Sequence, residues 1–146
     1  MGYPKAYSAY RDTNVKTASQ GKLIVLLYEG AVRQLSTAAS YFNSTGKIDP
    51  THIEKFNACI LKTQEIITEL QVSLDMDKGG DIAKSLMALY VYFNKELLDA
   101  NISQDRKKID FVLNMMNQLC DAWRVAANST ANAPAAEVQS ALNIEG

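Results

Sequence analysis

Residues 53–74 read IEKFNACILKTQEIITELQVSL, and this stretch decides the fold class. Its apolar side chains, with one threonine among them, recur at alternating steps of three and four residues, which keeps them on one face of an α-helix. A continuous apolar stripe of this kind predicts a helix that buries one face against partner helices in a bundle. The stripe consists of Ile53, Phe56, Ile60, Thr63, Ile67, Leu70 and Leu74.

Helix start and stop signals lie on both sides of this stretch. Before it, Asp49 can cap a helix N-terminus, and Pro50 suits the first helical position, where no hydrogen bond is lost. After it, residues 75–81 read DMDKGGD, in which the two glycines can adopt positive φ and Asp81 can cap a following helix. The stretch is therefore expected to form a helix of its own.

The same periodicity occurs in three further stretches. The first begins at Thr17 or Ser19, both good N-caps, and stops at residues 43–46, NSTG. Another follows Asp81, and the last is expected to begin with Ser103 as its cap. Their stripes are Leu23, Leu27, Ala31, Leu35, Ala38 and Phe42; Ile82, Leu86, Leu89, Phe93, Leu97 and Ala100; and Ile109, Val112, Met116, Leu119, Trp123 and Ala126.

Helices joined by short loops pack as antiparallel neighbours, so the chain is predicted to be an all-α, antiparallel four-helix bundle. Its 146 residues, 47% of them hydrophobic, suit one domain with a single core. We expect the bundle at residues 17–128, preceded by a polar N-terminal arm at residues 1–16. Residues 129–146 are poor in large apolar side chains and are expected to form a flexible tail, in which residues 136–142 could form a short helix.

Charge and hydropathy narrow the class of protein. Lys and Arg number 15 against 16 Asp and Glu, and no basic face stands out, which argues against nucleic acid as a partner. The N-terminus lacks an apolar signal core, and residues 23–28, the longest apolar run, are too few to cross a bilayer. We therefore expect a cytoplasmic protein without membrane insertion. Cys59 and Cys120 stand far apart within apolar patterns and are expected to be buried free thiols.

Catalytic and metal-binding chemistry find little support in the sequence. His52 is the only histidine and has no Glu three residues before it, so the Glu-x-x-His pairs of di-metal bundles are missing. Because His52 is also the only imidazole, a Ser or Cys nucleophile would have to use Lys or a carboxylate as its base. Glu65 and Glu69 share a helix face but lie off the apolar stripe, where a solvated surface is the default. No enzyme activity, cofactor or metal is therefore predicted.

Apolar residues remain after each helix has been given one buried stripe. Two explanations stay open: wide bundle faces absorb these residues between helices, or the residues form an exposed groove or an interface. Taken as a set, they favour a binding surface. They are Ile24, Tyr28, Ile66, Val72, Tyr90, Val91 and Tyr92.

Four strings of sequence stand out in order along the chain. They are Lys5-Ala6-Tyr7 with Thr17-Ala18-Ser19 and residues 22–31, KLIVLLYEGA; residues 73–75 and 78–83, SLD and KGGDIA, followed by Leu86 and Leu89-Tyr90; residues 97–101, LLDAN, with Asp105 and Ile109; and Ala122-Trp123-Arg124. Together they resemble the FliS family of flagellin export chaperones. The resemblance covers most of the chain, but it departs from the family at Gln20-Gly21, where a proline commonly follows the serine, and it does not include the tail.

The resemblance implies a four-helix bundle that binds the disordered C-terminal segment of flagellin, prevents premature polymerisation and delivers the segment to the export gate of the flagellar type III secretion apparatus. It also implies that the N-terminal arm, with Tyr7, helps to cover a hydrophobic cleft; Tyr10 is added for its proximity. The alternative is an oligomeric structural or regulatory bundle whose apolar surplus serves self-association. The expected flagellin contacts, in the groove or on the arm, are Tyr7, Tyr10, Ile24, Tyr28, Ile66, Leu86, Tyr90 and Trp123.

Overall fold

The computed structural model describes residues 17–128. Their helices are α2 (Thr17–Ser40), α3 (Ile53–Ser73), α4 (Gly80–Ser103) and α5 (Arg106–Ala127), with a short 3-10 helix, η1 (Pro50–His52), before α3. The described part contains no strand, and one isolated antiparallel bridge joins Phe42 to Ile48 in the first loop. The predicted all-α four-helix bundle is therefore confirmed. The predicted arm at residues 1–16 and the predicted tail at residues 129–146 lie outside the described residues.

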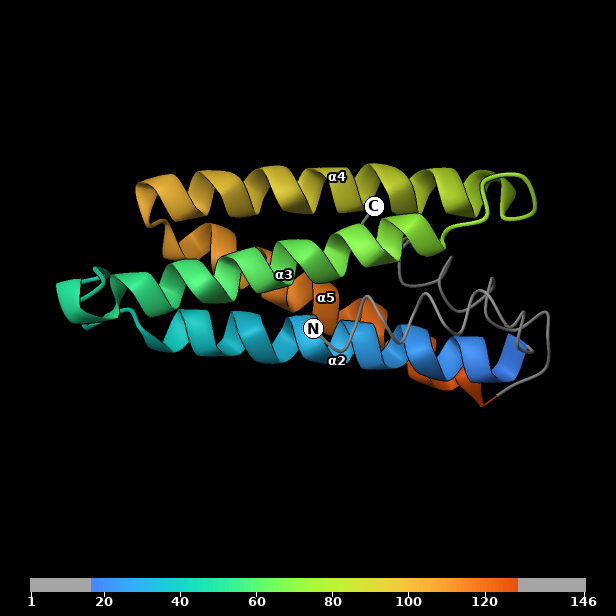
Figure 1. The fold of residues 1–146 in the computed structure, drawn as a ribbon, viewed down its shortest axis with the longest axis horizontal. Coiled ribbons are helices and arrows are strands. Elements are labelled where there is room, and N and C mark those ends of the chain that lie inside the picture. The colour runs from blue at the N-terminus through green and yellow to red at the C-terminus, as the bar shows by residue number, and fades with distance from the viewer. Residues whose placement is uncertain (1–16, 129–146) are drawn as a thin grey trace.

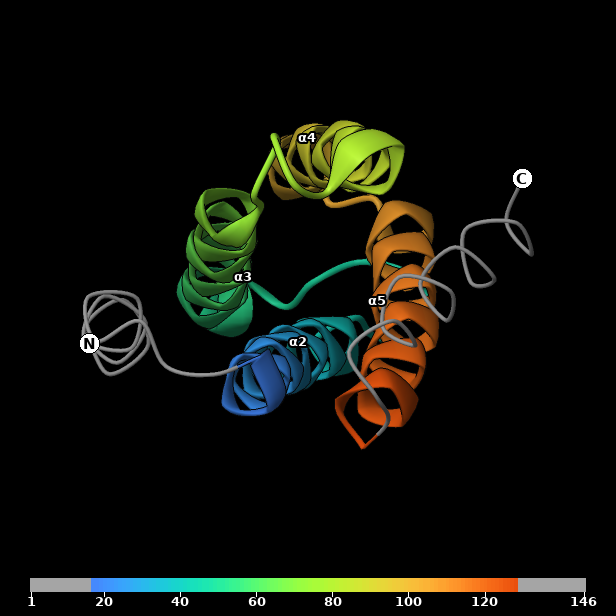
Figure 2. The same cartoon turned by 90° about the vertical axis from the view of Figure 1, so that its right-hand side faces the viewer.

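The helices form a ring in which each one packs against the two that flank it. The neighbouring pairs are α2 with α3, α3 with α4, α4 with α5, and α5 with α2, as the view along the bundle in Figure 2 shows. In Figure 1, α2, α3 and α4 follow the long axis, while α5 crosses behind them at an angle. The contacts of α2 with α5 and α3 are more extensive than those of α4 with its two neighbours.

The stretch that opened the sequence analysis supplies one wall of the core. From α3, Phe56, Ile60, Ile67 and Leu70 are fully buried, as their three- and four-residue spacing predicts. Thr63 is also fully buried, and its Oγ1 donates a hydrogen bond to the carbonyl oxygen of Cys59 at 2.8 Å. The polar position in the stripe is thus satisfied within its own helix.

Two of the predicted helix caps differ from those in the structure. Asp105 caps α5 by accepting a hydrogen bond from the backbone N–H of Lys107 at 3.0 Å, whereas the Ser103 hydroxyl donates to the Asp99 carbonyl at 2.7 Å. Asp81 lies in the first turn of α4, and Gly79 takes the cap position without a side-chain bond. An acidic residue in that first turn is still favourable, because it faces the positive end of the helix dipole. The predicted cap at Asp49 is present, because its Oδ1 accepts from the backbone N–H of Thr51 at 3.1 Å.

The loop before α4 depends on its two glycines for different reasons. Gly80 has a φ of +55°, which a residue with a side chain rarely adopts. Gly79 has an ordinary φ, but a Cβ there would lie 2.6 Å from the Ala83 Cβ and 2.7 Å from the Asp75 carbonyl oxygen. The prediction of positive φ is therefore correct for Gly80 and wrong for Gly79, where close packing is the requirement.

Candidate functional site: a binding surface on α4

Most of the predicted groove residues lie inside the bundle. Ile24, Tyr28, Ile66, Leu86 and Tyr90 each expose 5% of their surface or less, so the expectation that four of them, all but Leu86, lie partly outside the buried stripes is wrong. The expectation of exposure is confirmed for three other members of the apolar surplus. These exposed residues are Val72, Val91 and Tyr92.

The burial of two tyrosines has a specific cause. The hydroxyls of Tyr28 on α2 and Tyr90 on α4 form a hydrogen bond with each other across the core, which satisfies polar atoms that would otherwise be costly to bury. Burial, and then the neighbouring Tyr90, raise the pKa of Tyr28 well above its ordinary value, and burial also raises the pKa of Tyr90. Both side chains therefore stay neutral and act as packing residues.

The remaining predicted contacts are Tyr7, Tyr10 and Trp123. The two tyrosines lie outside the described residues. Trp123 is partly buried and packs against the core from α5. Its indole approaches the Tyr28 hydroxyl, yet the Nε1–H makes no hydrogen bond of acceptable geometry within residues 17–128. Trp123 is thus a packing residue with an unused donor.

The structure places an apolar surface on the solvent side of α4. Besides its buried stripe, this helix carries a second stripe at steps of four and three residues, which we call the α4 outer face. Leu98 is 52% exposed and Ile102 is 77% exposed, and two lysines lie in the same row. The members of the α4 outer face are Lys84, Ala88, Val91, Lys95, Leu98 and Ile102.

The seam between α3 and α4 is only partly closed by polar contacts. The Nε2 of Gln64 donates to the carbonyl oxygen of Asn94 at 3.3 Å, and the Nε2 of Gln71 lies 3.6 Å from the sulfur of Met87. The buried Oδ1 atoms of Asn94 and Asn101 find no hydrogen-bond partner among the described residues. The described residues thus give this seam two polar contacts, each from a glutamine of α3 to α4.

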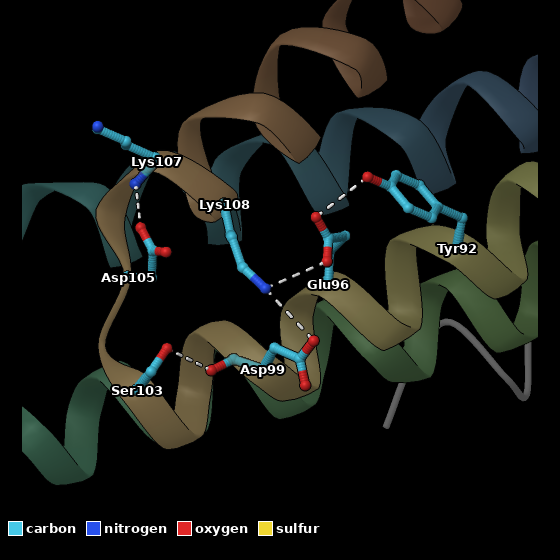
Figure 3. A network of polar contacts seen from close by, with 7 residues as sticks. All are labelled: Tyr92, Glu96, Asp99, Ser103, Asp105, Lys107 and Lys108. Carbon is cyan, nitrogen blue, oxygen red and sulfur yellow. Dashed lines mark hydrogen bonds and ion pairs between the residues drawn. The ribbon is translucent and has the colours of Figure 1, made fainter.

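The opposite edge of α4 is fastened to α5 by charged groups, which Figure 3 shows. The Nζ of Lys108 lies 3.4 Å from Glu96 Oε2 and 3.3 Å from Asp99 Oδ2. The Tyr92 hydroxyl donates to Glu96 Oε1 at 3.1 Å, and its ring meets Phe111 edge-on with the centroids 6.0 Å apart. These contacts hold α4 to the start of α5 and leave the α4 outer face free of them.

Within residues 17–128, no three His, Cys, Asp or Glu side chains come together in a group that could hold a metal ion. Among the helices of that same part, none has the length and apolar character needed to cross a membrane. An apolar row that includes Lys84 and Lys95 is suited to the apolar face of an amphipathic helix.

Sequence reasoning missed most of the α4 outer face. Val91 was noted, but Leu98, Ile102 and the intervening Lys95 were not, although their spacing of three and four residues was visible in the sequence. The second stripe was missed because α4 carries two apolar stripes. The more strongly apolar one, from Leu86 to Ala100, is sufficient by itself to explain a helix with one buried face.

Known proteins are similar in sequence to this chain over most of its length. The model of a family described as flagellar protein FliS matches residues 3–130. The flagellar secretion chaperone FliS of Bacillus subtilis is 30% identical over 88% of this chain and 91% of its own length. The proteins of the same description from Campylobacter jejuni and Salmonella typhimurium are each 32% identical, over 85% and 82% of this chain and 92% and 86% of their own lengths. The chain therefore belongs to the FliS family of flagellar secretion chaperones.

Proposed function

We propose that this protein is a cytoplasmic export chaperone for flagellin, which binds the disordered C-terminal segment of flagellin, keeps it from polymerising and presents it to the export gate of the flagellar secretion apparatus. Family membership supports the flagellar role. FliS is a family of chaperones and not of enzymes, so the action is binding alone.

The α4 outer face is the observation that carries this proposal. Val91, Leu98 and Ile102 lie on one side of a helix whose other side is already in the core. A disordered segment that folds as an amphipathic helix can bury such a row, and the apolar area removed from water offsets the entropy lost on folding.

The earlier candidate residues take revised roles in this proposal. Because Ile24, Tyr28, Ile66, Leu86 and Tyr90 are buried, we assign them to support of the surface from beneath. Tyr7 and Tyr10 remain proposed contacts of the arm, and Trp123 remains a proposed contact of α5.

Calorimetry and circular dichroism with the C-terminal segment of the host's flagellin test the proposal. We expect one-to-one binding with more helix than the two components have separately. Leu98→Ser should weaken binding about tenfold or more, since a buried leucine contributes about 1.5–3 kcal/mol. Leu26→Ser on α2 is the matched control, because both leucines are 52% exposed. If neither heat nor additional helix is observed, the flagellin proposal is wrong.

The arm gives an independent test. We expect it to cover a hydrophobic cleft of the bundle in the free protein, as the family resemblance implies, and to move when flagellin binds. Deletion of residues 1–10 should therefore change the dissociation constant of the flagellin segment markedly, and an unchanged constant would exclude this role for Tyr7 and Tyr10.

The alternative, a structural or regulatory oligomer, uses the same exposed apolar residues. Sedimentation separates the two: a chaperone of one client should sediment as a single chain and gain one segment, whereas an oligomer should self-associate through Val91 and Leu98 without responding to flagellin.

A further inference from the structure

We propose that the chain's own residues 136–145 dock on the α4 outer face and compete there with the client. The docking part is independent of the flagellin proposal, and only the competition rests on it. The matching family model ends at residue 130. The segment that follows is therefore not part of the family pattern and can have a function specific to this chain.

Charge favours this occupant. Glu137 and Glu145 are the only charged side chains in residues 129–146, so the segment is purely acidic. The charged members of the α4 outer face are Lys84 and Lys95, both exposed and both basic. Opposite charges on the two partners favour encounter and fix orientation, even though each exposed pair contributes little free energy.

The apolar pattern also fits. In a helical conformation, Val138 and Leu142 share one face, and Ala141 lies beside them. This narrow apolar stripe is too small to form a core, but it matches a single exposed row such as Val91 and Leu98 on α4. A weak contact of this size is one that a longer client helix can displace.

The connection is long enough. α5 ends at Ala127, at the end of the bundle where α4 begins, as Figure 1 shows. Residues 129–135, when extended, span about 23–25 Å. At that end α5 lies beside α2, since a Cβ on Gly21 would lie 3.3 Å from the Ala127 Cβ, and α4 lies across the ring in Figure 2. Two spacings of about 8–10 Å between neighbouring axes make about 16–20 Å, which the extended tether can span.

Photo-cross-linking in the full chain tests the docking. Benzoylphenylalanine placed at Leu98 should cross-link to residues 136–145 of the same chain, and the same probe at Leu26 should not. Val138→Ser with Leu142→Ser should lower the yield about fivefold or more, because the two apolar contacts are lost. Gln139→Ser with Asn143→Ser, at the same spacing but about 100° around the helix, should leave it unchanged.

Every other pattern of cross-links overturns the docking. No cross-link to the segment, or equal effects of the two double variants, shows that the contact is absent. A cross-linked dimer whose yield rises with protein concentration shows that a second copy occupies the face.

Adding the flagellin segment tests the competition. The added flagellin segment should reduce the yield of the cross-link. In the Val138→Ser, Leu142→Ser variant, the dissociation constant of the flagellin segment should fall severalfold; an unchanged constant overturns the competition. If the cross-link forms but flagellin does not bind, the proposed function fails and the docking stands. If flagellin binds without any cross-link to the segment, the docking fails and the proposed function stands.

Discussion

α2 and α4 have the same length but differ in how many large apolar side chains they expose to solvent. Each has 24 residues, and they occupy opposite positions in the ring of helices in Figure 2. α2 leaves one large apolar side chain, Leu26, exposed to solvent. On α4 four such side chains are exposed: Val91, Tyr92, Leu98 and Ile102.

The difference shows how one bundle separates stability from binding. The contacts of α2 with α5 and α3 are extensive, and Arg124 of α5 adds an ion pair to Glu29 at 3.0 Å. α4 has smaller contacts on both sides. A helix that is held less extensively and carries a second apolar row is suited to accept a partner without disturbing the core.

The largest expected effect comes from paired neighbouring leucines. Leu27→Ala on α2 and Leu97→Ala on α4 should each lower the free energy of unfolding by about 2–5 kcal/mol, because both side chains are fully buried. Leu26→Ala and Leu98→Ala, one residue away, should change it by about 0.5 kcal/mol or less. Urea unfolding followed by circular dichroism measures all four.

The two exposed leucines should then differ in binding. Leu98→Ala should weaken binding of the flagellin segment, whereas Leu26→Ala should leave that binding unchanged, although both positions are equally exposed. Equal effects of the two on binding would remove the distinction between α2 and α4.

The next effect concerns the link between these two helices. Tyr28→Phe or Tyr90→Phe leaves the remaining hydroxyl buried without its partner and should cost about 1–3 kcal/mol. The double variant should cost less than the sum of the singles, because no unpaired hydroxyl then remains. A double-mutant cycle from denaturant unfolding gives the coupling free energy, and strict additivity would show that the hydroxyls do not interact.

The raised pKa values of the same two tyrosines lead us to expect that the protein loses stability in alkali. Their pKa values are raised in the folded protein, whereas in the unfolded chain tyrosine ionises near pH 10. Their contribution is thus complete below about pH 10 and falls as the pH rises further, since only the unfolded state then loses protons. The free energy of unfolding should differ less between about pH 8 and pH 11 for the Tyr28→Phe, Tyr90→Phe double variant than for the wild type. An equal difference in the two proteins would show that these tyrosines do not cause the loss of stability.

The sequence predicts the helices because their periodicity is local. The stripe from Ile53 to Leu74 needs no knowledge of other helices, and all four helices lie where such stripes lie. The predicted caps of α4 and α5 were each two residues from the observed ones, because Asp81, Ser103 and Asp105 are all chemically able to cap.

The burial of the tyrosines could not be read in the same way. Their spacing fits a buried stripe, since Tyr28 follows Ile24 by four residues and Tyr90 follows Leu86 by four. Each also has a polar end, so it suits a surface as well as a core. What makes their burial tolerable is a hydrogen bond between residues 62 positions apart, which satisfies both hydroxyls. Only the packing of α2 opposite α4 brings the two hydroxyls together, and sequence spacing within either helix carries no trace of it.

The smallest effect is expected where α4 is fastened to α5. Desolvation alone would lower the pKa of Lys108, but the hydrogen bond to Asp99 and the charge of Glu96 outweigh it and raise the pKa. Its contribution is therefore present at neutral pH and fades in alkali. Lys108→Met should speed amide hydrogen exchange in residues 92–103, and added salt should narrow the difference from wild type, because the group is partly exposed.

Lys107→Met is the control for that variant, because Lys107 is exposed and loses the same charge one residue away. If Lys108→Met speeds exchange in α4 and also loosens the flagellin complex, the charged contacts of Figure 3 hold α4 in the position that binding requires. If exchange in α4 is the same in the two variants, apolar contacts alone hold α4, and its smaller contacts with its neighbours are sufficient for its position.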